Sequence, residues 1–190
     1  MRFCGSGGQG VITAAVIFAE AAGVYGDYYV CQTQSYGPQS RGGTSKAEVV
    51  ISTQEIDYPS VVNMDCFLAM NQSALDSFFS DFNPKGLLIV DSTFVDQTPT
   101  SSSISLPFTE VARELGKEIV ANIVALGAVA QLCDKVPIDD LEKAVLARVP
   151  PKFADLNREA LFAGVKLAKD INLDGLSHSP TLDDIYGMTD

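Results

Sequence analysis

The sequence has few of the side chains that carry catalysis. Its 190 residues include a single histidine, His178, which stands between two serines near the carboxyl end. With one histidine, a serine–histidine–aspartate relay is not credible, and we interpret His178 as a solvated loop residue. The patterns HExxH, GxSxG and the P-loop lysine are also absent. We therefore expect no catalytic residue, and no complete active site, on this chain alone.

Clustered metal ligands are lacking as well. The four cysteines are widely scattered beside apolar neighbours, and no CxxC spacing occurs among Cys4, Cys31, Cys66 and Cys133. Iron–sulfur clusters and structural zinc sites need several thiolates or imidazoles brought together. The sequence therefore predicts reduced core cysteines and no metal ligand.

Basic residues are few, and long apolar runs are missing. Lys and Arg number 13 against 24 Asp and Glu, which gives a formal net charge of −11. This excess of acid disfavours binding to nucleic acid or to an anionic membrane. No apolar stretch approaches the roughly 20 residues of a membrane span, and no cationic leader is found at the amino terminus. These features predict a cytoplasmic protein with neither nucleic acid nor membrane as a partner.

The sequence does contain alternating apolar strands and helix-forming segments. Strands are expected at residues 1–4, 28–33, 45–52, 66–70, 87–90 and 105–107, and helices at 11–22, 73–82, 109–115, 123–133, 138–149 and 157–169. Strands that are apolar along their length indicate a sheet covered on both faces. We predict an α/β fold with three α/β/α layers and a mostly parallel, Rossmann-like central sheet. Residues 1–173 form one domain in this interpretation, and 174–190 form an acidic tail, either disordered or laid on a partner.

The first glycine-rich segment, GSGGQG at residues 5–10, connects the first strand to the first helix. Glycines at such a junction permit positive φ, and the helix amino terminus offers unpaired N–H groups to an anion. Gly5, Gly7 and Gly10 also fit the spacing GxGxxG, but the acid that would hold a ribose is missing after the second strand, because Asp27 precedes it. Ligand binding and a simple tight turn both remain open.

The second glycine-rich segment is SYGPQSRGG at residues 35–43. Tyr36, Gly37 and Pro38 are typical of a turn, and Arg41 stands beside two glycines that let another surface come close. Its guanidinium can fork onto a carboxylate or phosphate. The alternative is an arginine that ties the loop to an acid of its own chain or of a partner.

The expected helix at 123–133 is apolar nearly all round. Such a helix is either a central core helix or part of a subunit contact, and its small residues would permit close helix–helix approach. We favour a partly intermolecular role. The isolated chain is therefore expected to form a homo-oligomer or to need partners.

Four motifs together resemble the gamma subunit of 2-oxoacid:ferredoxin oxidoreductases. They are GSGGQG, SYGPQSRGG, KAEVVIS at residues 46–52 and NIVALGA at 122–128, and in motif order the resemblance runs from Cys4 to about Lys169. The SYGP and RGG loop with its following strand looks most like the 2-oxoglutarate enzymes, and less like the pyruvate or indolepyruvate members.

The resemblance implies a subunit of a complex that oxidatively decarboxylates a 2-oxoacid, transfers the acyl group to coenzyme A and reduces ferredoxin. It implies that thiamine diphosphate, Mg and the iron–sulfur clusters reside on alpha and beta subunits, with a delta subunit as a further candidate partner. Coenzyme A is then a substrate of a shared site, and the candidate binding residues are Gly7, Gly8, Gln9, Gly10, Tyr36, Gly37, Arg41, Gly42 and Gly43. The alternatives are a purely structural assembly subunit and, ranked lowest, a stand-alone dinucleotide-binding oxidoreductase.

Overall fold

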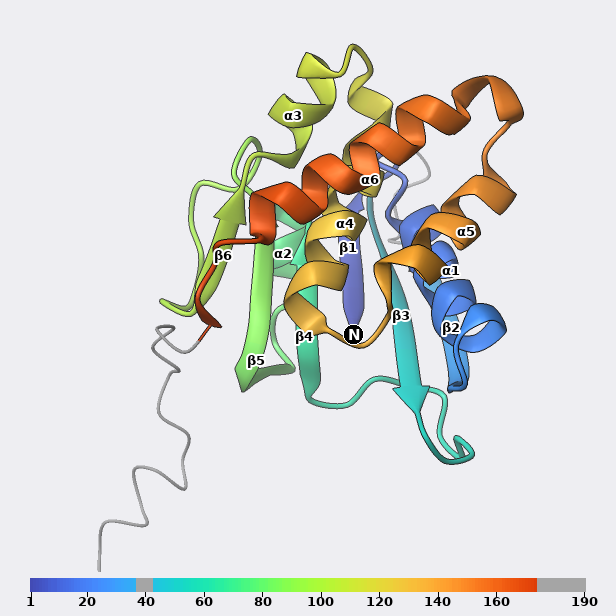
Figure 1. Cartoon of the computed structure of the whole chain (residues 1–190). Helices are drawn as coiled ribbons and strands as arrows, with labels where there is room; N and C mark the ends of the chain where they lie inside the picture. The colour runs from blue at the N-terminus through green and yellow to red at the C-terminus, as the bar shows by residue number, and fades with distance from the viewer. Residues whose placement is uncertain (37–42, 174–190) are drawn as a thin grey trace, which may run out of the picture.

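The computed structural model describes residues 1–36 and 43–173, and its centre is a six-stranded sheet with the order β2-β3-β1-β4-β5-β6 (Figure 1). The strands are β1 (Arg2–Ser6), β2 (Tyr29–Tyr36), β3 (Thr44–Ser52), β4 (Met64–Ala69), β5 (Phe82–Asp91) and β6 (Ser103–Leu106). The tail and its predicted behaviour lie outside the described residues.

The sheet is mostly parallel, as predicted. The pairs β1–β4, β4–β5 and β5–β6 are parallel, whereas β3 runs antiparallel to both β1 and β2. The predicted edge strand is confirmed as β6. Its partner β5 is longer than expected: the sequence predicts a helix up to Phe82, but the helix ends at Phe78 and Phe82 already opens the strand.

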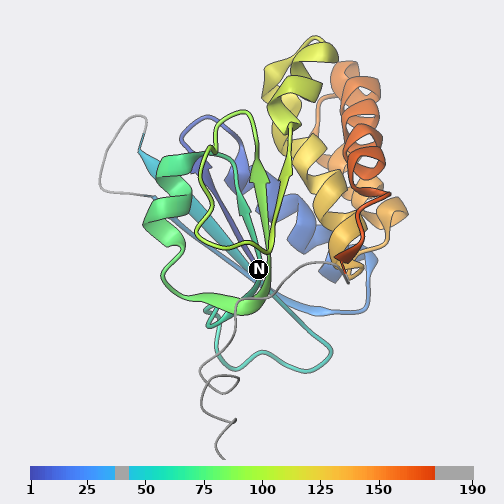
Figure 2. The same ribbon diagram turned by 90° about the vertical axis from the view of Figure 1, so that its left-hand side faces the viewer.

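Helices cover both faces of the sheet, so the three-layer prediction is confirmed (Figure 2). In the described ranges, one face carries only α2 (Gln72–Phe78), and on the other lie α1 (Val11–Glu20), α3 (Phe108–Glu114), α4 (Ala121–Cys133), α5 (Ile138–Arg148) and α6 (Ala154–Ala168). Successive side chains of a strand point to opposite faces of the sheet, so each strand contributes to both cores. In β1, Phe3 packs on the face covered by the five helices and Cys4 on the face covered by α2. Among the described residues, no helix is both long and apolar enough to cross a membrane.

The helix ends follow from local sequence. Asn71 caps α2, as predicted, because its side-chain oxygen accepts a hydrogen bond of 2.8 Å from the backbone N–H of Ala74. Helix α5 carries Asp139 and Asp140 in its first turn and Arg148 in its last, which complements the helix dipole at both ends.

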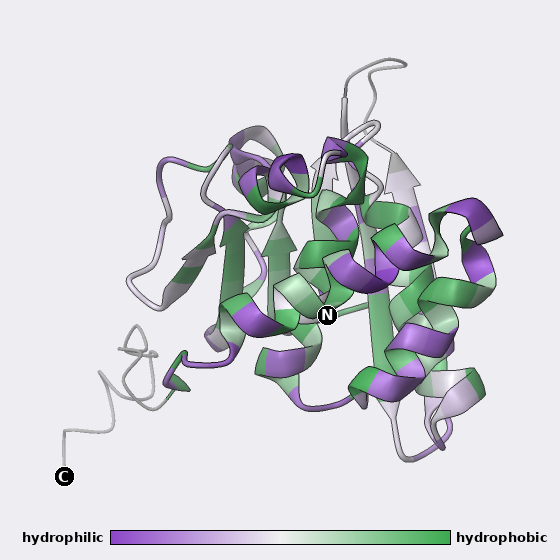
Figure 3. Cartoon of the chain, turned by 45° about the horizontal axis from the view of Figure 1, so that its top comes forward, coloured by the Kyte–Doolittle hydropathy of each residue, from purple (hydrophilic) through white to green (hydrophobic). Residues whose placement is uncertain are grey.

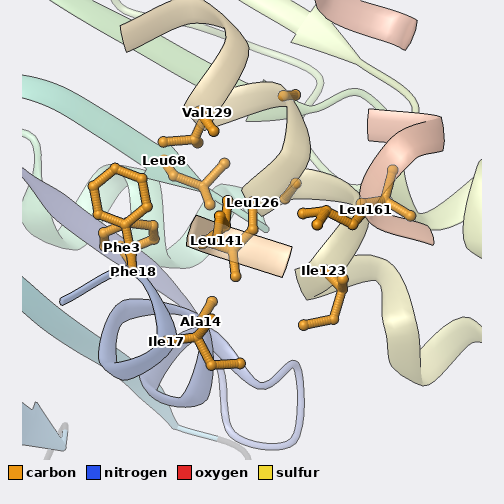
Figure 4. Close-up of a cluster of buried hydrophobic side chains, with 14 of the residues drawn as sticks. Phe3, Ala14, Ile17, Phe18, Leu68, Ile123, Leu126, Val129, Leu141 and Leu161 are labelled. Carbon is orange, nitrogen blue, oxygen red and sulfur yellow. The ribbon is translucent and has the colours of Figure 1, made fainter. Parts of the chain in front are cut away.

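Helix α4 is buried by its own chain. Apart from Gln131 and Cys133, all its residues are buried, between the sheet on one side and α6 on the other. Green, apolar residues gather on the sheet and on the inner helices, while purple residues mark the outward sides (Figure 3), and Leu126 of α4 points into the cluster that contains Phe3 and Phe18 (Figure 4). The expected intermolecular role of this helix is therefore wrong, since α6 occupies the face that a partner would need. Self-association of the isolated chain stays a prediction without this support.

Candidate functional site

The first glycine-rich loop joins β1 to α1 and requires its glycines. Gly8 and Gly10 have φ angles of 100° and 71°, in the left-handed region that side-chain-bearing residues avoid. Gly10 is the amino-terminal cap residue of α1, and no side chain caps this helix end. The first-turn N–H groups and the positive end of the helix dipole therefore face the loop.

The two glycine-rich segments meet at this end of the sheet. The N–H of Gly7 donates a 3.0 Å hydrogen bond to the carbonyl of Gly43, and the Ser45 hydroxyl donates to the carbonyl of Gly5 at 3.3 Å. Tyr36, the last residue of β2, pairs with Ser45 in the sheet. Gly37, Arg41 and Gly42, also predicted as site residues, lie outside the described residues.

Gln9 is held inside the chain. Its side-chain oxygen accepts hydrogen bonds from the N–H of Ser6 at 2.8 Å and from the Asn71 amide at 3.2 Å, and its amide nitrogen donates to the carbonyl of Met70 at 3.0 Å. These bonds tie the loop to the carboxyl end of β4. Gln9 therefore positions the loop, and a ligand contact falls more readily to Gly7 and Gly8, which are exposed.

Asn122 contacts the first glycine-rich loop, although it lies 112 residues after Gly10 in the sequence. It lies in the first turn of α4, is buried, and donates a 3.2 Å hydrogen bond to the carbonyl of Gly10. In the sequence, Asn122 begins the NIVALGA motif, and the motif alone does not assign it to the site. The available signal was a polar amide at the start of an otherwise apolar helix, which needs a partner when buried.

A groove of about 720 Å³ opens beside the loop. Gly7, Gly8 and the first turn of α1 line it together with Lys117 and Ile119, and 75% of the surface of Ile119 is exposed. The rest of the lining is largely apolar; Arg148, which also borders the groove, is paired with Glu20. The groove can therefore receive an anionic group at the helix terminus and an apolar chain along its wall.

The arrangement does not suit a dinucleotide. In the dinucleotide-binding Rossmann fold, the second strand is parallel to the first strand and lies beside it, and the acid that binds the ribose follows this second strand. Here antiparallel β3 lies between β1 and β2, and the exposed Asp27 precedes β2, at the end of the sheet away from the glycine loop.

Metal ligands are not grouped in the part of the chain that the structure describes. No set of three or more His, Cys, Asp or Glu residues there could hold a metal ion. Asp91, at the carboxyl end of β5, is buried and accepts a hydrogen bond from the hydroxyl of Thr109, so it ties β5 to α3. His178 lies in the tail, outside the described residues.

Gly10→Ala is expected to destabilise the fold through two separable costs. A left-handed alanine costs about 1–2 kcal/mol, and its Cβ would lie 2.6 Å from Nδ2 of Asn122, which adds an overlap. Gly8→Ala is the matched control, because Gly8 also has positive φ but has no atom within 4 Å of the added Cβ. Urea unfolding of both variants, with and without Asn122→Ala, measures the difference. Adding Asn122→Ala should reduce the loss of unfolding free energy caused by Gly10→Ala but not the loss caused by Gly8→Ala. If Asn122→Ala changed both losses equally, the predicted overlap between residue 10 and Asn122 would be contradicted.

Comparison with known proteins places the chain in a family. The family model for pyruvate ferredoxin/flavodoxin oxidoreductase matches residues 1–167. The chain belongs to this family. The resemblance to the gamma subunits, inferred from the glycine-rich motifs, is confirmed by the solved gamma subunit in the next paragraph.

Relatives within this oxidoreductase family match nearly end to end. The chain is 41% identical over 176 residues to the 2-oxoglutarate synthase subunit KorC of Methanocaldococcus jannaschii, which covers 90% of this chain and 94% of that one. Against the pyruvate synthase subunit PorC of Methanothermobacter marburgensis the identity is 32% over 164 residues, covering 84% and 92%. The crystal structure of the gamma subunit of a keto/oxoacid ferredoxin oxidoreductase from Geobacter sulfurreducens is 43% identical, with a TM-score of 0.80 and coverage of 90% and 98%.

Proposed function

We propose that the chain is the KorC-type gamma subunit of a 2-oxoglutarate:ferredoxin oxidoreductase. The complex converts 2-oxoglutarate, coenzyme A and oxidised ferredoxin to succinyl-CoA, carbon dioxide and reduced ferredoxin. The observation that carries this proposal is the near full-length identity of 41% to a 2-oxoglutarate synthase subunit, against 32% to a pyruvate synthase subunit.

Within the complex, the glycine loops and their groove contribute to the coenzyme A site. The anionic diphosphate fits the amino terminus of α1 beside Gly7 and Gly8, where unpaired N–H groups and the helix dipole favour negative charge. Lys117 adds a positive charge to the lining of the groove, and the apolar lining suits the uncharged pantetheine arm. Tyr36, Gly37, Arg41, Gly42 and Gly43 belong to the same proposed site through the second glycine segment.

The resident cofactors belong to other chains in this proposal. An iron–sulfur cluster takes four protein ligands, usually cysteine thiolates, whereas the described part of this chain brings only Cys66 and Cys133 together. The donor set therefore does not fit a cluster. Thiamine diphosphate, Mg and the clusters are assigned to the alpha and beta subunits, with delta as a further candidate, and ferredoxin docks on the complex.

Anaerobic copurification with the native partners tests the proposal. The tagged chain should retain partner subunits that contain thiamine diphosphate and iron, and the complex should reduce ferredoxin with 2-oxoglutarate and coenzyme A. Pyruvate and 2-oxoisovalerate serve as substrate controls. A complex that prefers pyruvate would overturn the substrate assignment alone, and a chain that purifies without partners while retaining NAD would overturn the whole proposal.

Arg41→Ala is expected to raise the coenzyme A concentration needed for half-maximal activity by about tenfold to 150-fold, because a charged hydrogen bond contributes about 1.5–3 kcal/mol. Oxoacid-dependent partial reactions without coenzyme A should change little. Arg158→Ala is the control, since it removes the same charge from the outer side of α6, where Arg158 is about half exposed and pairs with Glu142. The readouts are a coenzyme A titration and the subunit stoichiometry.

The same variant tests the second candidate, a purely structural assembly subunit. The internal bonding of Gln9 and the contact of Asn122 with Gly10 favour that alternative for part of the loop. If Arg41 is an assembly contact, Arg41→Ala should weaken complex formation and depress every partial reaction together. An intact complex with an unchanged titration would remove Arg41 from the site.

A further inference from the structure

A second groove lies at the opposite end of the sheet from the glycine loops. It encloses about 1060 Å³ and is lined by Met1 just before β1, the end of β3 and the middle of β5. Two cysteines border it, Cys66 on β4 and Cys133 at the carboxyl end of α4. Neither has a part in the proposed coenzyme A site.

The two thiols are already in contact. Their sulfur atoms are 3.4 Å apart, and with both protonated the Cys133 thiol donates a hydrogen bond to Cys66. A disulfide requires a sulfur–sulfur distance of about 2.0 Å, so the two sulfur atoms must approach each other by about 1.4 Å. Cys66 is 4% exposed, whereas Cys133 is partly exposed and open to a small reagent from the groove.

The surroundings make Cys133 the more reactive partner. When Cys133 is ionised, the Cys66 thiol becomes the donor, and this hydrogen bond lowers the pKa of Cys133 against the opposing effect of burial; the amino group of Met1 and Lys135 add to the lowering. Asp65 opposes it. The same hydrogen bond, together with burial, raises the pKa of Cys66. The carboxyl end of α4 also disfavours a thiolate at Cys133, so the contact between the two sulfurs, rather than acidity alone, distinguishes this pair.

We propose that Cys66 and Cys133 form a thiol modification site, which a peroxide entering the 1060 Å³ groove oxidises reversibly to a disulfide. The Cys133 thiolate attacks one peroxide oxygen, the O–O bond breaks, and hydroxide leaves and is protonated to water. The sulfur of Cys66 then attacks the sulfenic acid at Cys133. The S–S bond forms, the S–O bond breaks, and the Cys66 proton leaves with the hydroxyl as a second water. Two thiols lose two electrons in total, and one hydrogen peroxide gains them.

The other cysteines supply controls within the same chain. Cys31 is partly exposed like Cys133 but has no thiol partner among the described residues, whereas Cys4 is fully buried. Burial raises the pKa of the Cys4 thiol well above its ordinary value, which makes it unreactive. A peroxide at one equivalent should therefore select the pair.

The test uses the full-length reduced chain, treated under anaerobic conditions with one equivalent of hydrogen peroxide. Thiols counted after denaturation should fall from four to two per chain, and peptide mapping should find a Cys66–Cys133 cross-link that dithiothreitol reverses. Cys31→Ser should fall from three thiols to one with the same cross-link. In Cys66→Ser, Cys133 should accumulate as a sulfenic acid that dimedone traps.

Two results would overturn the inference. One is oxidation of Cys133 to sulfinic acid in the wild-type chain without any linked peptide. The other is a cross-link that involves Cys31, or one that appears only in urea, since either would show that the native contact does not direct the reaction. Both readouts come from the wild-type chain and do not require a variant to fold.

Discussion

Gly164→Ala is expected to lower the free energy of unfolding by about 3 kcal/mol, although alanine is the better helix former by about 1 kcal/mol. Helices α4 and α6 cross at their glycines. A Cβ at Gly164 would lie 1.8 Å from the carbonyl oxygen of Val124, and a Cβ at Gly127 would lie 2.0 Å from that of Leu161. Both obstacles are backbone atoms, so relief requires the two helices to separate. The midpoint of thermal unfolding should fall by about 6–12 °C, at about 2–4 °C per kcal/mol for a chain of this size.

Lys166→Ala is the matched control on the same helix, because that side chain is exposed and the change should be within about 0.5 kcal/mol. The double variant Gly127→Ala with Gly164→Ala should lose less unfolding free energy than the sum of the losses in the two single variants. One methyl group already pushes α4 and α6 apart, and this makes room for the second. Calorimetry and urea unfolding give both values. A stabilised Gly164→Ala chain would show that the helices do not cross this closely.

The sequence predicts those parts of the fold that local patterns encode. Uninterrupted apolar segments predict strands of a covered sheet, and Asn71 predicts the start of α2 through its own hydrogen bond. Gly8 and Gly10 predict the turn from β1 to α1 because only glycine adopts positive φ without cost. Each of these signals depends on residues close together in the sequence, so it can be recognised without knowledge of the tertiary structure.

Long-range partners leave no such local signal. Apolar composition cannot tell whether α4 is covered by a second chain or by α6, and the close packing of Gly127 against Leu161 decides it only in three dimensions. The antiparallel insertion of β3 beside β1 is likewise a pairing between distant segments. The end of α2 was misplaced because Phe79 and Phe82 continue an apolar pattern that suits either a helix or the following strand.

The candidate site stays a prediction, and the structure shows how its two segments meet. The two glycine segments are separate in the sequence, and they come together through the hydrogen bond between Gly7 and Gly43, as a shared site would require. Gln9 was assigned to ligand binding because it stands among the glycines, yet three of its neighbours use its amide. Asn122 was not assigned, because its contact with Gly10 depends on how α4 docks against α1.

Arg2→Leu is expected to cost about 3 kcal/mol of unfolding free energy at pH 7, because it removes one partner of a buried ion pair. Arg2 is 4% exposed, and its guanidinium donates to Glu48 through Nε at 2.8 Å and to Asp81 through Nη2 at 2.8 Å. Without the arginine, the buried Glu48 carboxylate retains only Lys46 as an ion-pair partner among the described residues. Arg113→Leu is the control: its pair with Glu118 is about half exposed, and its loss should cost less than about 1 kcal/mol.

The cost of Arg2→Leu should shrink in acid. Burial pushes the pKa of Glu48 upward, but the hydrogen bonds from Arg2 and Lys46 outweigh it and hold the pKa below its ordinary value. The hydrogen bond from Arg2 likewise lowers the pKa of Asp81. A carboxylate with a lowered folded pKa stabilises the fold fully above the unfolded pKa, about 4.3 for Glu and about 3.9 for Asp, and loses that contribution as pH falls through the folded pKa. Urea unfolding from pH 7 to pH 3 should therefore show the wild-type and Arg2→Leu curves converging below about pH 4. A constant gap would instead assign the loss to packing of the arginine stem.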